Sequence, residues 1–363
     1  VFMYIKSLQT LNFRNYDNLS LNLCPNVNVF IGDNAQGKTN ILELIYYCGF
    51  AKSHRTNKDK DIIKWNCEET FIRLDVHKKR LDKIIDIKIL KDGKKAVKIN
   101  SIKVNKIGEL IGTFNVVIFS PEDLKIVKES PGIRRKFMDM EISQLNVKYY
   151  NNLVNYNKIL SERNSVLKCA KIDESMLDIY DMQLAQYGEY IIKARLEYLN
   201  SLNKYSKQIH SDITSGKEEI NFEYISNVKN LDNIKESLLN LLRKSRKKDI
   251  EKRITSIGPH KDDFSILLNG VDAKAFGSQG QQRTSVLTIK FASLKIIKEV
   301  AGEYPVLLLD DVLSELDFSR KSYILKSINS IQTIITCTGI EDLTRYLDEH
   351  SKIFIVKDGI VKE

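Results

Sequence analysis

The stretch VNVFIGDNAQGKTNILELIYYCGF, residues 27–50, decides the fold. Residues 27–31 form a short apolar run with β-branched side chains, which predicts a buried strand, and residues 40–50 predict a helix. Between them, residues 32–39 fit the pattern G-x-x-x-x-G-K-[ST] in the strand-to-helix context that this phosphate-binding motif requires. The alternative interpretation is an ordinary glycine-containing turn.

The chemistry expected of this loop follows from its residue types. Glycines let the backbone curl so that its amide groups point at phosphate oxygens, and the helix N-terminus adds partial positive charge. Lys38 can reach the β- and γ-phosphates and assist catalysis, and the Thr39 hydroxyl can bind Mg²⁺. The expected nucleotide-binding residues are Gly32, Asp33, Asn34, Ala35, Gln36, Gly37, Lys38, Thr39 and Asn40.

A second, acidic motif lies in PVLLLDD, residues 305–311. A buried apolar strand that ends in Asp310 places this carboxylate at the strand's C-terminal edge, where ligands bind in parallel sheets. We expect Asp310 to hold Mg²⁺ together with Thr39, and Asp311 to act as the catalytic base that polarises an attacking water. Acidic pairs also begin many ordinary loops, so this pair indicates a functional site only in combination with the phosphate loop.

Two further segments indicate the class of nucleotide-binding protein. SQGQQR, residues 278–283, resembles the ABC signature sequence, and SELD, residues 314–317, resembles the D-loop. A serine hydroxyl, glycine amides and a helix N-terminus make a second phosphate cradle, so Ser278, Gly280 and Gln281 are expected to contact nucleotide. In ABC proteins the signature of one subunit closes on the γ-phosphate held by the other. The resemblance therefore implies an ATP-induced homodimer.

Within the ABC and SMC-like ATPases, the chain resembles the RecF family of recombination and repair proteins along nearly its whole length. The segments that carry the resemblance are NFRNY (12–16), GDNAQGKTNILE (32–43), KSHRT (52–56), FSPEDL (119–124), RRKFMD (134–139), GPHKDDF (258–264), FGSQGQQR (276–283) and LLLDDVLSELD (307–317). The resemblance implies a bacterial cytoplasmic protein that uses ATP and Mg²⁺ and binds double-stranded and gapped DNA. It also implies cooperation with RecR and RecO in loading RecA at single-strand gaps, and a link to replication and the SOS response.

The chain departs from transport cassettes of the ABC class at three positions. A glutamine is usual where Ser120 to Asp123 stand, a glutamate where Asp311 stands, and a histidine where Thr338 or a neighbour stands. A carboxylate that is one methylene shorter predicts slow hydrolysis, so we expect a weak DNA-dependent ATPase in which ATP acts as a timed clamp. In the alternative interpretation, a shifted backbone lets Asp311 reach the water.

The pattern of apolar residues predicts an α/β fold, with a mixed sheet formed from both chain ends and an inserted helical lobe that contains a short antiparallel helix pair. We expect a first ATPase part at 3–130, the helical lobe at 131–253, and a second ATPase part with signature, Mg²⁺-binding strand and D-loop at 254–363. Strands are predicted at 71–77, 85–90, 97–104, 113–120, 221–226, 264–269, 305–310 and 333–338, with a closing hairpin at 354–363. Met3 is expected to be the true start.

Composition is consistent with a DNA-binding protein in the cytoplasm. The net charge is +10 with a pI near 9.1, which favours a polyanionic partner. No membrane helix or signal-peptide pattern is expected, and five scattered cysteines without a Cys-x-x-Cys pair indicate a reducing compartment. The candidate DNA contacts are Lys52, Arg55, Lys58, Lys60, Lys78, Lys79 and Arg80, and the alternative interpretation is surface charge that favours solubility.

Three other classes of protein are alternatives to an ATP-switched DNA-repair protein. The nucleotide-binding subunit of an ABC transporter is disfavoured by the missing glutamine and histidine. A metabolic kinase or GTPase is disfavoured by the signature-like segment, and a long-armed SMC protein would need far longer helices. His54 and His260 are expected to make polar loop contacts, and neither suggests catalysis or a metal site.

Overall fold

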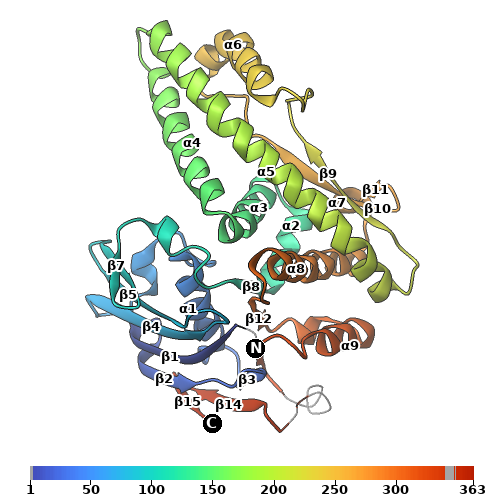
Figure 1. Cartoon of the computed structure of the whole chain (residues 1–363). Helices are drawn as coiled ribbons and strands as arrows, with labels where there is room; N and C mark the ends of the chain where they lie inside the picture. The colour runs from blue at the N-terminus through green and yellow to red at the C-terminus, as the bar shows by residue number, and fades with distance from the viewer. Residues whose placement is uncertain (1–2, 340–346, 348) are drawn as a thin grey trace. The chain divides into compact units, whose positions relative to one another are not determined.

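A mixed sheet that draws strands from both ends of the chain carries the phosphate loop (Figure 1). Its order is β15-β14-β3-β13-β12-β8, and all neighbours are parallel except the β14–β15 hairpin. The strands are β3 (Val27–Ile31), β8 (Val116–Phe119), β12 (Val306–Asp310), β13 (Thr333–Cys337), β14 (Lys352–Lys357) and β15 (Ile360–Lys362). The central strands β3, β8, β12 and β13 are almost continuously buried, as expected for parallel strands that are covered on both faces.

The computed structural model describes residues 3–339, 347 and 349–363. It divides the chain into an ATPase-like unit, formed by the segments up to Asp123 and from Leu287 onward, and a helical unit, Leu124–Val286. The sequence placed these limits at 130/131 and 253/254, so the signature segment lies in the helical unit of the structure. None of the five cysteines forms a disulfide.

An antiparallel sheet completes the ATPase-like unit. Its order is β2-β1-β4-β5-β6-β7, with β1 (Tyr4–Phe13), β2 (Tyr16–Asn22), β4 (Glu69–His77), β5 (Lys83–Leu90), β6 (Lys95–Ile99) and β7 (Ile102–Val104). Alternate residues of β4 are buried, as expected for a sheet with one covered face. The prediction of a single strand over 97–104 is wrong. Asn100 and Ser101 both have positive φ, 49° and 68°, and turn the chain back as the β6–β7 hairpin.

Helix α1 (Lys38–Phe50) lies between the two sheets and contacts β4 on one side and β8, β12 and β13 on the other. It is buried nearly all round, which explains why residues 41–50 are apolar apart from Glu43. Gln332 joins the same core, since its side chain hydrogen-bonds the backbone N–H and C=O of Ile5 and the C=O of Cys24. The remaining elements of this unit are η1 (Asp59–Ile62), η2 (Ile107–Glu109), η4 (Leu313–Glu315) and α9 (Phe318–Ser327), while η3 (Pro121–Leu124) and α8 (Gln279–Ala301) run across its limits.

The helical unit is built around a long helix, α5, with α4 and α6 packed against it (Figure 1). Its elements are α2 (Lys125–Lys128), α3 (Pro131–Leu145), α4 (Val147–Val166), α5 (Glu174–Thr214), β9 (Ile220–Ile225), α6 (Ile234–Lys252), β10 (Asp263–Leu268), β11 (Val271–Asp272) and α7 (Ala273–Phe276). The strands form a small sheet of order β11-β10-β9. Leucines and tyrosines recur at near-heptad spacing over residues 145–167 and 180–209, which predicts two helices of about 30 to 40 residues. Helix α5 has 41 residues but α4 only 20, because Asn146 ends α3 and accepts a hydrogen bond from the Tyr149 N–H to cap α4.

Residues 258–264, one of the segments that carried the resemblance, fasten the helical unit together. The Pro259 C=O accepts a hydrogen bond from the buried Arg195, and Asp263 pairs with Arg134 at 2.7 Å. His260 contacts the Tyr156 hydroxyl through Nδ1 at 2.7 Å and the Thr255 C=O through Nε2 at 3.1 Å. Burial lowers the pKa of His260 to about 4, so the ring is neutral at physiological pH. The expectation of a polar loop contact at His260 matches this structural role.

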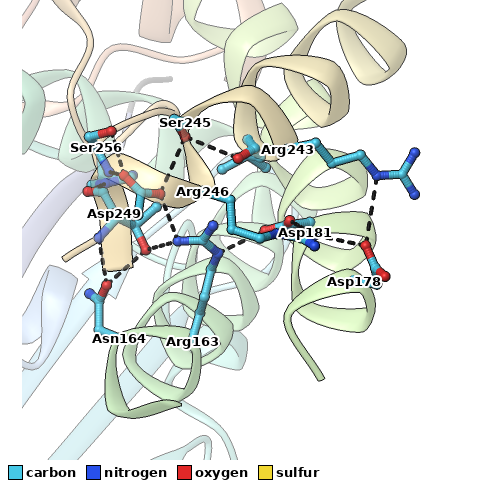
Figure 2. Close-up of polar contacts among 12 residues, drawn as sticks. Arg163, Asn164, Asp178, Asp181, Arg243, Ser245, Arg246, Asp249 and Ser256 are labelled. Carbon is cyan, nitrogen blue, oxygen red and sulfur yellow. Dashed lines mark hydrogen bonds and ion pairs between the residues drawn. The ribbon is translucent and has the colours of Figure 1, made fainter. Parts of the chain in front are cut away.

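A buried charge cluster joins α4, α5 and α6 (Figure 2). Arg163, whose side chain is fully buried, pairs with Asp181 at 2.7 Å and with Asp249 at 2.9 Å. Arg246 pairs with the half-exposed Asp178 and with the fully buried Asp181, so this basic residue of α6 also neutralises a buried acid. Because unpaired charges are costly inside a protein, these partners fix how the three helices pack.

Replacement of the central arginine tests this cluster. Arg163→Met should lower the free energy of unfolding of the helical unit by about 3 kcal/mol, because two buried carboxylates lose a partner. The matched control Lys193→Ala removes an exposed pair with Glu189 and should cost less than about 0.5 kcal/mol. Urea unfolding followed by circular dichroism measures both values, and equal costs would contradict the proposed role of the cluster.

Candidate nucleotide-binding site

The phosphate loop joins the end of β3 to the start of α1, as the motif predicts. Gly37 is the residue before α1 and has φ of 111°, a conformation that favours glycine. A Cβ atom at Gly32 would lie 2.2 Å from the Val356 carbonyl oxygen, so only glycine allows β14 to approach the loop so closely. Asp33, Asn34 and Ala35 are exposed, which leaves the outer rim of the loop accessible to a ligand.

Lys38 closes the loop from within. Its side chain turns back so that Nζ donates to the carbonyl oxygens of Gly32 at 2.6 Å and Asp33 at 2.7 Å. The residue is only 7% exposed, so the ammonium group lies at the bottom of the loop and not in bulk water. An anionic ligand in the loop would offer this ammonium stronger, charge-assisted hydrogen bonds than the two carbonyls do.

Asp310 lies where the sheet meets α1. Its Oδ1 accepts hydrogen bonds from the Thr39 hydroxyl at 2.8 Å and from the Thr336 hydroxyl at 2.9 Å. Thr336 is the neighbour of Asp310 across the parallel β12–β13 pair. Thr39 and Asp310, which the sequence assigned to one cation site from 271 positions apart, are therefore in direct contact.

The oxygen atoms of Thr39 and Asp310 suit Mg²⁺, which prefers oxygen ligands. This ion is usually bound by one or two carboxylates plus phosphate oxygens and water. Within the described part of the chain, no group of three or more His, Cys, Asp and Glu side chains could hold a metal ion.

Asp311 has an unusual backbone and an unusual carboxylate. Its φ is 51°, in the left-handed region, and its N–H donates to the Thr336 C=O at 3.2 Å. The Ser314 hydroxyl donates to the Asp311 C=O at 2.7 Å, which links it to the D-loop-like segment. Its Oδ1 is buried and accepts no hydrogen bond from any described residue. A strained residue with an unused buried acceptor is typical of a functional position.

Residues 14–16 brace the phosphate loop, a role that motif analysis missed. The Tyr16 hydroxyl donates to the Gly37 C=O at 3.1 Å, and the Asn15 side-chain amide donates to the Gln36 C=O at 3.2 Å. The Asn15 Oδ1 accepts from the Asn40 amide at 2.8 Å. Asn40, expected to contact nucleotide, thus also anchors the loop to the β1–β2 turn.

Glu43 is the second missed residue, and it holds three segments together. Its fully buried carboxylate accepts two hydrogen bonds from Arg14, at 2.6 and 2.8 Å, and one from Arg55 at 3.3 Å. The Ser53 hydroxyl donates to the same carboxylate, and Arg55 also reaches the Asn40 Oδ1 at 2.7 Å. A lone glutamate inside the apolar run of residues 41–50 is the signal that could have revealed it, because a buried charge needs partners.

The charges around Glu43 change its titration. Burial raises the pKa of its carboxyl, but the hydrogen bonds from Arg14 and Ser53 outweigh burial and hold the pKa below its ordinary value. His54 lies beside the Glu43 carboxylate and packs edge-on against Tyr46, with 5.1 Å between the ring centroids. Burial lowers the pKa of His54, and its Nδ1 has no hydrogen-bond partner among the described residues.

The signature-like segment begins α8 in the helical unit. The Ser278 hydroxyl accepts from the Gln281 N–H at 3.2 Å, while the Gln281 Oε1 accepts from the Ser278 N–H at 2.8 Å. This reciprocal pair is a capping box, which satisfies two backbone N–H groups at the helix N-terminus. Ser278 is exposed and Gly280 partly exposed, so a ligand could reach both.

The candidate DNA contacts separate into two groups. Lys52, Lys58, Lys60, Lys79 and Arg80 are exposed. Arg55 is committed to Glu43 and Asn40, and Lys78 pairs with Glu303 at 3.2 Å and donates to the Thr113 C=O at 3.0 Å. Thr338 or a neighbour stands where transport cassettes have a histidine, and of these neighbours residues 340–346 lie outside the described residues.

A strand, phosphate loop and helix that face an acidic strand end define an ATPase head of the kind shared by ABC and SMC proteins. Residues 4–362 match the family described as RecF/RecN/SMC N terminal domain. The chain is 76% identical over 360 residues to the DNA replication and repair protein RecF of Clostridium perfringens (strain 13 / Type A), with 99% of this chain and 100% of that protein covered. It is 64% identical to the RecF of Clostridium botulinum (strain Alaska E43 / Type E3), with 98% and 99% covered.

Solved structures agree with this result. The structure of the recombination mediator protein RecF-ATP in the RecFOR pathway is 40% identical and superposes with a TM-score of 0.91 over 99% of each chain. An Smc head domain from Pyrococcus furiosus, with 16% identity and a TM-score of 0.58 over 99% of this chain and 95% of that one, shares the fold. The chain belongs to the RecF family of DNA replication and repair proteins. The resemblance drawn from the motifs is confirmed, and it displaces the transporter alternative.

The Glu43 carboxylate makes a testable contribution to stability. Glu43→Gln should lower the free energy of unfolding at neutral pH by about 1–3 kcal/mol, because Arg14 loses a charged partner. The folded-state pKa of Glu43 lies below its ordinary value of 4.5, so the wild-type advantage is complete above that pH and disappears as the pH falls through the folded pKa. Urea unfolding at several pH values measures the difference. An exposed control, Glu68→Gln, should show almost none, and a Glu43 difference that grows in acid would contradict the assignment.

Proposed function

We propose that this chain is an ATP-switched DNA-binding protein of recombinational repair and replication, whose two copies close around two ATP molecules. The observation that carries this proposal is the contact of the Thr39 hydroxyl with Asp310 Oδ1, at 2.8 Å, beside a phosphate loop whose lysine is turned inward. It unites a phosphate cradle with a carboxylate from a distant part of the chain. Solved relatives named RecF-ATP and RecF-ATPrS support the choice of ATP.

In the proposed state, residues 32–40 surround the β- and γ-phosphates. Lys38 leaves the Gly32 and Asp33 carbonyls and bonds the phosphates, while the loop amides and the α1 N-terminus supply further donors. Thr39 and Asp310 would hold Mg²⁺, which neutralises phosphate charge when bound. The bracing of the loop by Asn15 and Tyr16 keeps its amides aimed at one point.

The second half of each pocket comes from the partner copy in this proposal. Ser278, Gly280 and Gln281 begin a helix whose N-terminus is open to solvent, and such an end favours a phosphate anion. Two identical heads then share two nucleotides, so neither pocket is complete in a single copy. ATP is the ligand that joins them.

Hydrolysis would release the pair. The unused Oδ1 of Asp311 is available to accept a proton from an attacking water, and burial keeps competing donors away. Because an aspartate is shorter than the glutamate usual in transport cassettes, we propose a weak, DNA-dependent ATPase that serves as a switch.

Double-stranded and gapped DNA is the proposed polyanionic partner. Lys52, Lys58 and Lys60 are exposed, and contacts of lysines with phosphates give affinity without sequence preference. We propose that the protein works in the cytoplasm with RecR and RecO to assist RecA loading at single-strand gaps. No helix in the described part of the chain is long and apolar enough to cross a membrane.

Sedimentation velocity with and without ATP, Mg²⁺ and gapped DNA tests the dimer. The wild type should sediment as a dimer only with ATP, and Lys38→Met and Ser278→Arg should each abolish that dimer. Lys38→Met removes a phosphate ligand. Ser278→Arg fills the cradle that this copy offers to the nucleotide held by its partner. Lys193→Met and Ser201→Arg, at partly or fully exposed sites on α5, serve as matched controls. A wild type that stays monomeric with ATP and DNA would overturn the proposal.

Turnover measurements test the role of Asp311. Asp311→Asn should lower kcat about 100-fold or more while ATP-dependent dimerisation persists, because the amide cannot take the proton but still fits the site. Unchanged turnover in this variant would place the base elsewhere. A wild-type rate of many per second would contradict the timed switch.

A further inference from the structure

The signature-like segment is held by an acid from a different part of the helical unit. Gln281 uses its Oε1 in the capping box with Ser278, which leaves its Nε2 to donate elsewhere. That Nε2 donates to Glu218 Oε1 at 2.9 Å. One side-chain amide therefore connects the helix cap to a carboxylate 63 positions earlier in the chain.

Glu218 is itself fixed in place by its surroundings. It lies in the turn that follows α5, where Ser215 and Gly216 have positive φ of 55° and 74°. The next residue, Glu219, makes two hydrogen bonds with Asn269. The Glu219 N–H donates to Asn269 Oδ1 at 2.8 Å, and the Asn269 N–H donates to the Glu219 C=O at 2.9 Å. The turn is thus clamped between the end of α5 and the β10–β11 hairpin.

The other carboxylate oxygen of Glu218 faces α5. Glu218 Oε2 lies 3.4 Å from Nε2 of His210, whose side chain is fully buried in the last turns of that helix. The Glu218 side chain is 20% exposed, whereas that of the adjacent Glu219 is 72% exposed. Of these two neighbouring acids, only Glu218 points inward at structured partners.

We propose that Glu218 is a positioning residue for the signature-like segment, which sets the orientation of Gln281 and, through the capping box, of Ser278. This inference rests on the proposed ATP-dependent dimer, in which these residues meet the nucleotide of the partner copy. Without the carboxylate, the Gln281 amide can rotate and the cap loses one of its two reciprocal bonds. The end of α5 then no longer determines how the cradle is presented.

The consequence for function is specific. Glu218 does not touch the phosphate loop of its own copy in this scheme, so its loss should leave nucleotide binding by a single copy intact. Assembly depends on two signature segments, so any disorder at the cap acts twice in the dimer. A shift of the α5 end would move Glu218, and through Gln281 and Ser278 it would change the affinity of the dimer.

Three variants separate positioning from general structure. Glu218→Ala removes the acceptor, Glu218→Gln keeps an oxygen acceptor in the same place, and Glu219→Ala is the matched control at the exposed neighbour. In the nucleotide-free protein, hydrogen exchange of the Ser278 and Gln281 amides should be roughly tenfold faster in Glu218→Ala, because both are protected by the cap. The other two variants should exchange like the wild type. Unchanged exchange in Glu218→Ala would overturn the positioning role whether or not the dimer forms.

Sedimentation in ATP completes the test. The dimer dissociation constant should rise about tenfold or more in Glu218→Ala and should be largely restored in Glu218→Gln, while ATP affinity measured at low protein concentration stays unchanged. Faster exchange combined with wild-type dimerisation would overturn the functional part of the inference. A wild type that never dimerises would refute the proposed function instead, and the exchange result would still decide whether Glu218 positions the cap.

Discussion

The Asp310 carboxylate, held by the hydroxyls of Thr39 and Thr336, is the contact on which the arrangement of the ATPase-like unit depends. It joins the first turn of α1 to two parallel strands that come from the opposite end of the chain. The contact forms only if β3 lies beside β13 and β12 follows β13 in the sheet. The apolar surface of α1 and the close approach of β14 to Gly32 also hold the phosphate loop and the first turn of α1 at this sheet.

Buried polar groups do much of the positioning in both units. Glu43 gathers Arg14, Ser53 and Arg55 behind the phosphate loop, and Arg163 gathers Asp181 and Asp249 among three helices. Apolar contacts alone would tolerate small slides between these elements. Directional hydrogen bonds to buried charges do not, because a displaced partner leaves an uncompensated charge. Precision at the nucleotide site is therefore obtained from residues that need not touch nucleotide.

The fold and the core of the site could be predicted because their signals are local. The strand, loop and helix of residues 27–50 are contiguous, and the acidic strand end at Asp310 carries its own apolar pattern. The braces at Arg14, Asn15 and Tyr16 could not be predicted as such, since their partners lie 21 to 29 positions away and no periodicity links them. The break at Asn100 and Ser101 was missed because their turn interrupts an apparently continuous alternation. The signature segment sits with the helical unit because its contacts are made to Glu218 and Ala273, which a linear motif cannot reveal.

The place of β3 in its sheet has a consequence for synthesis on the ribosome. Both neighbours of β3, β13 and β14, come from the last part of the chain. The phosphate loop therefore emerges early but lacks flanking strands until Lys357 has been translated, roughly twenty seconds to a minute later at ordinary elongation rates. The helical unit, which is one continuous segment, has all its residues available well before that moment. A nascent chain must keep the apolar strand β3 without its neighbours during this interval, and such unpaired strand edges are prone to aggregation.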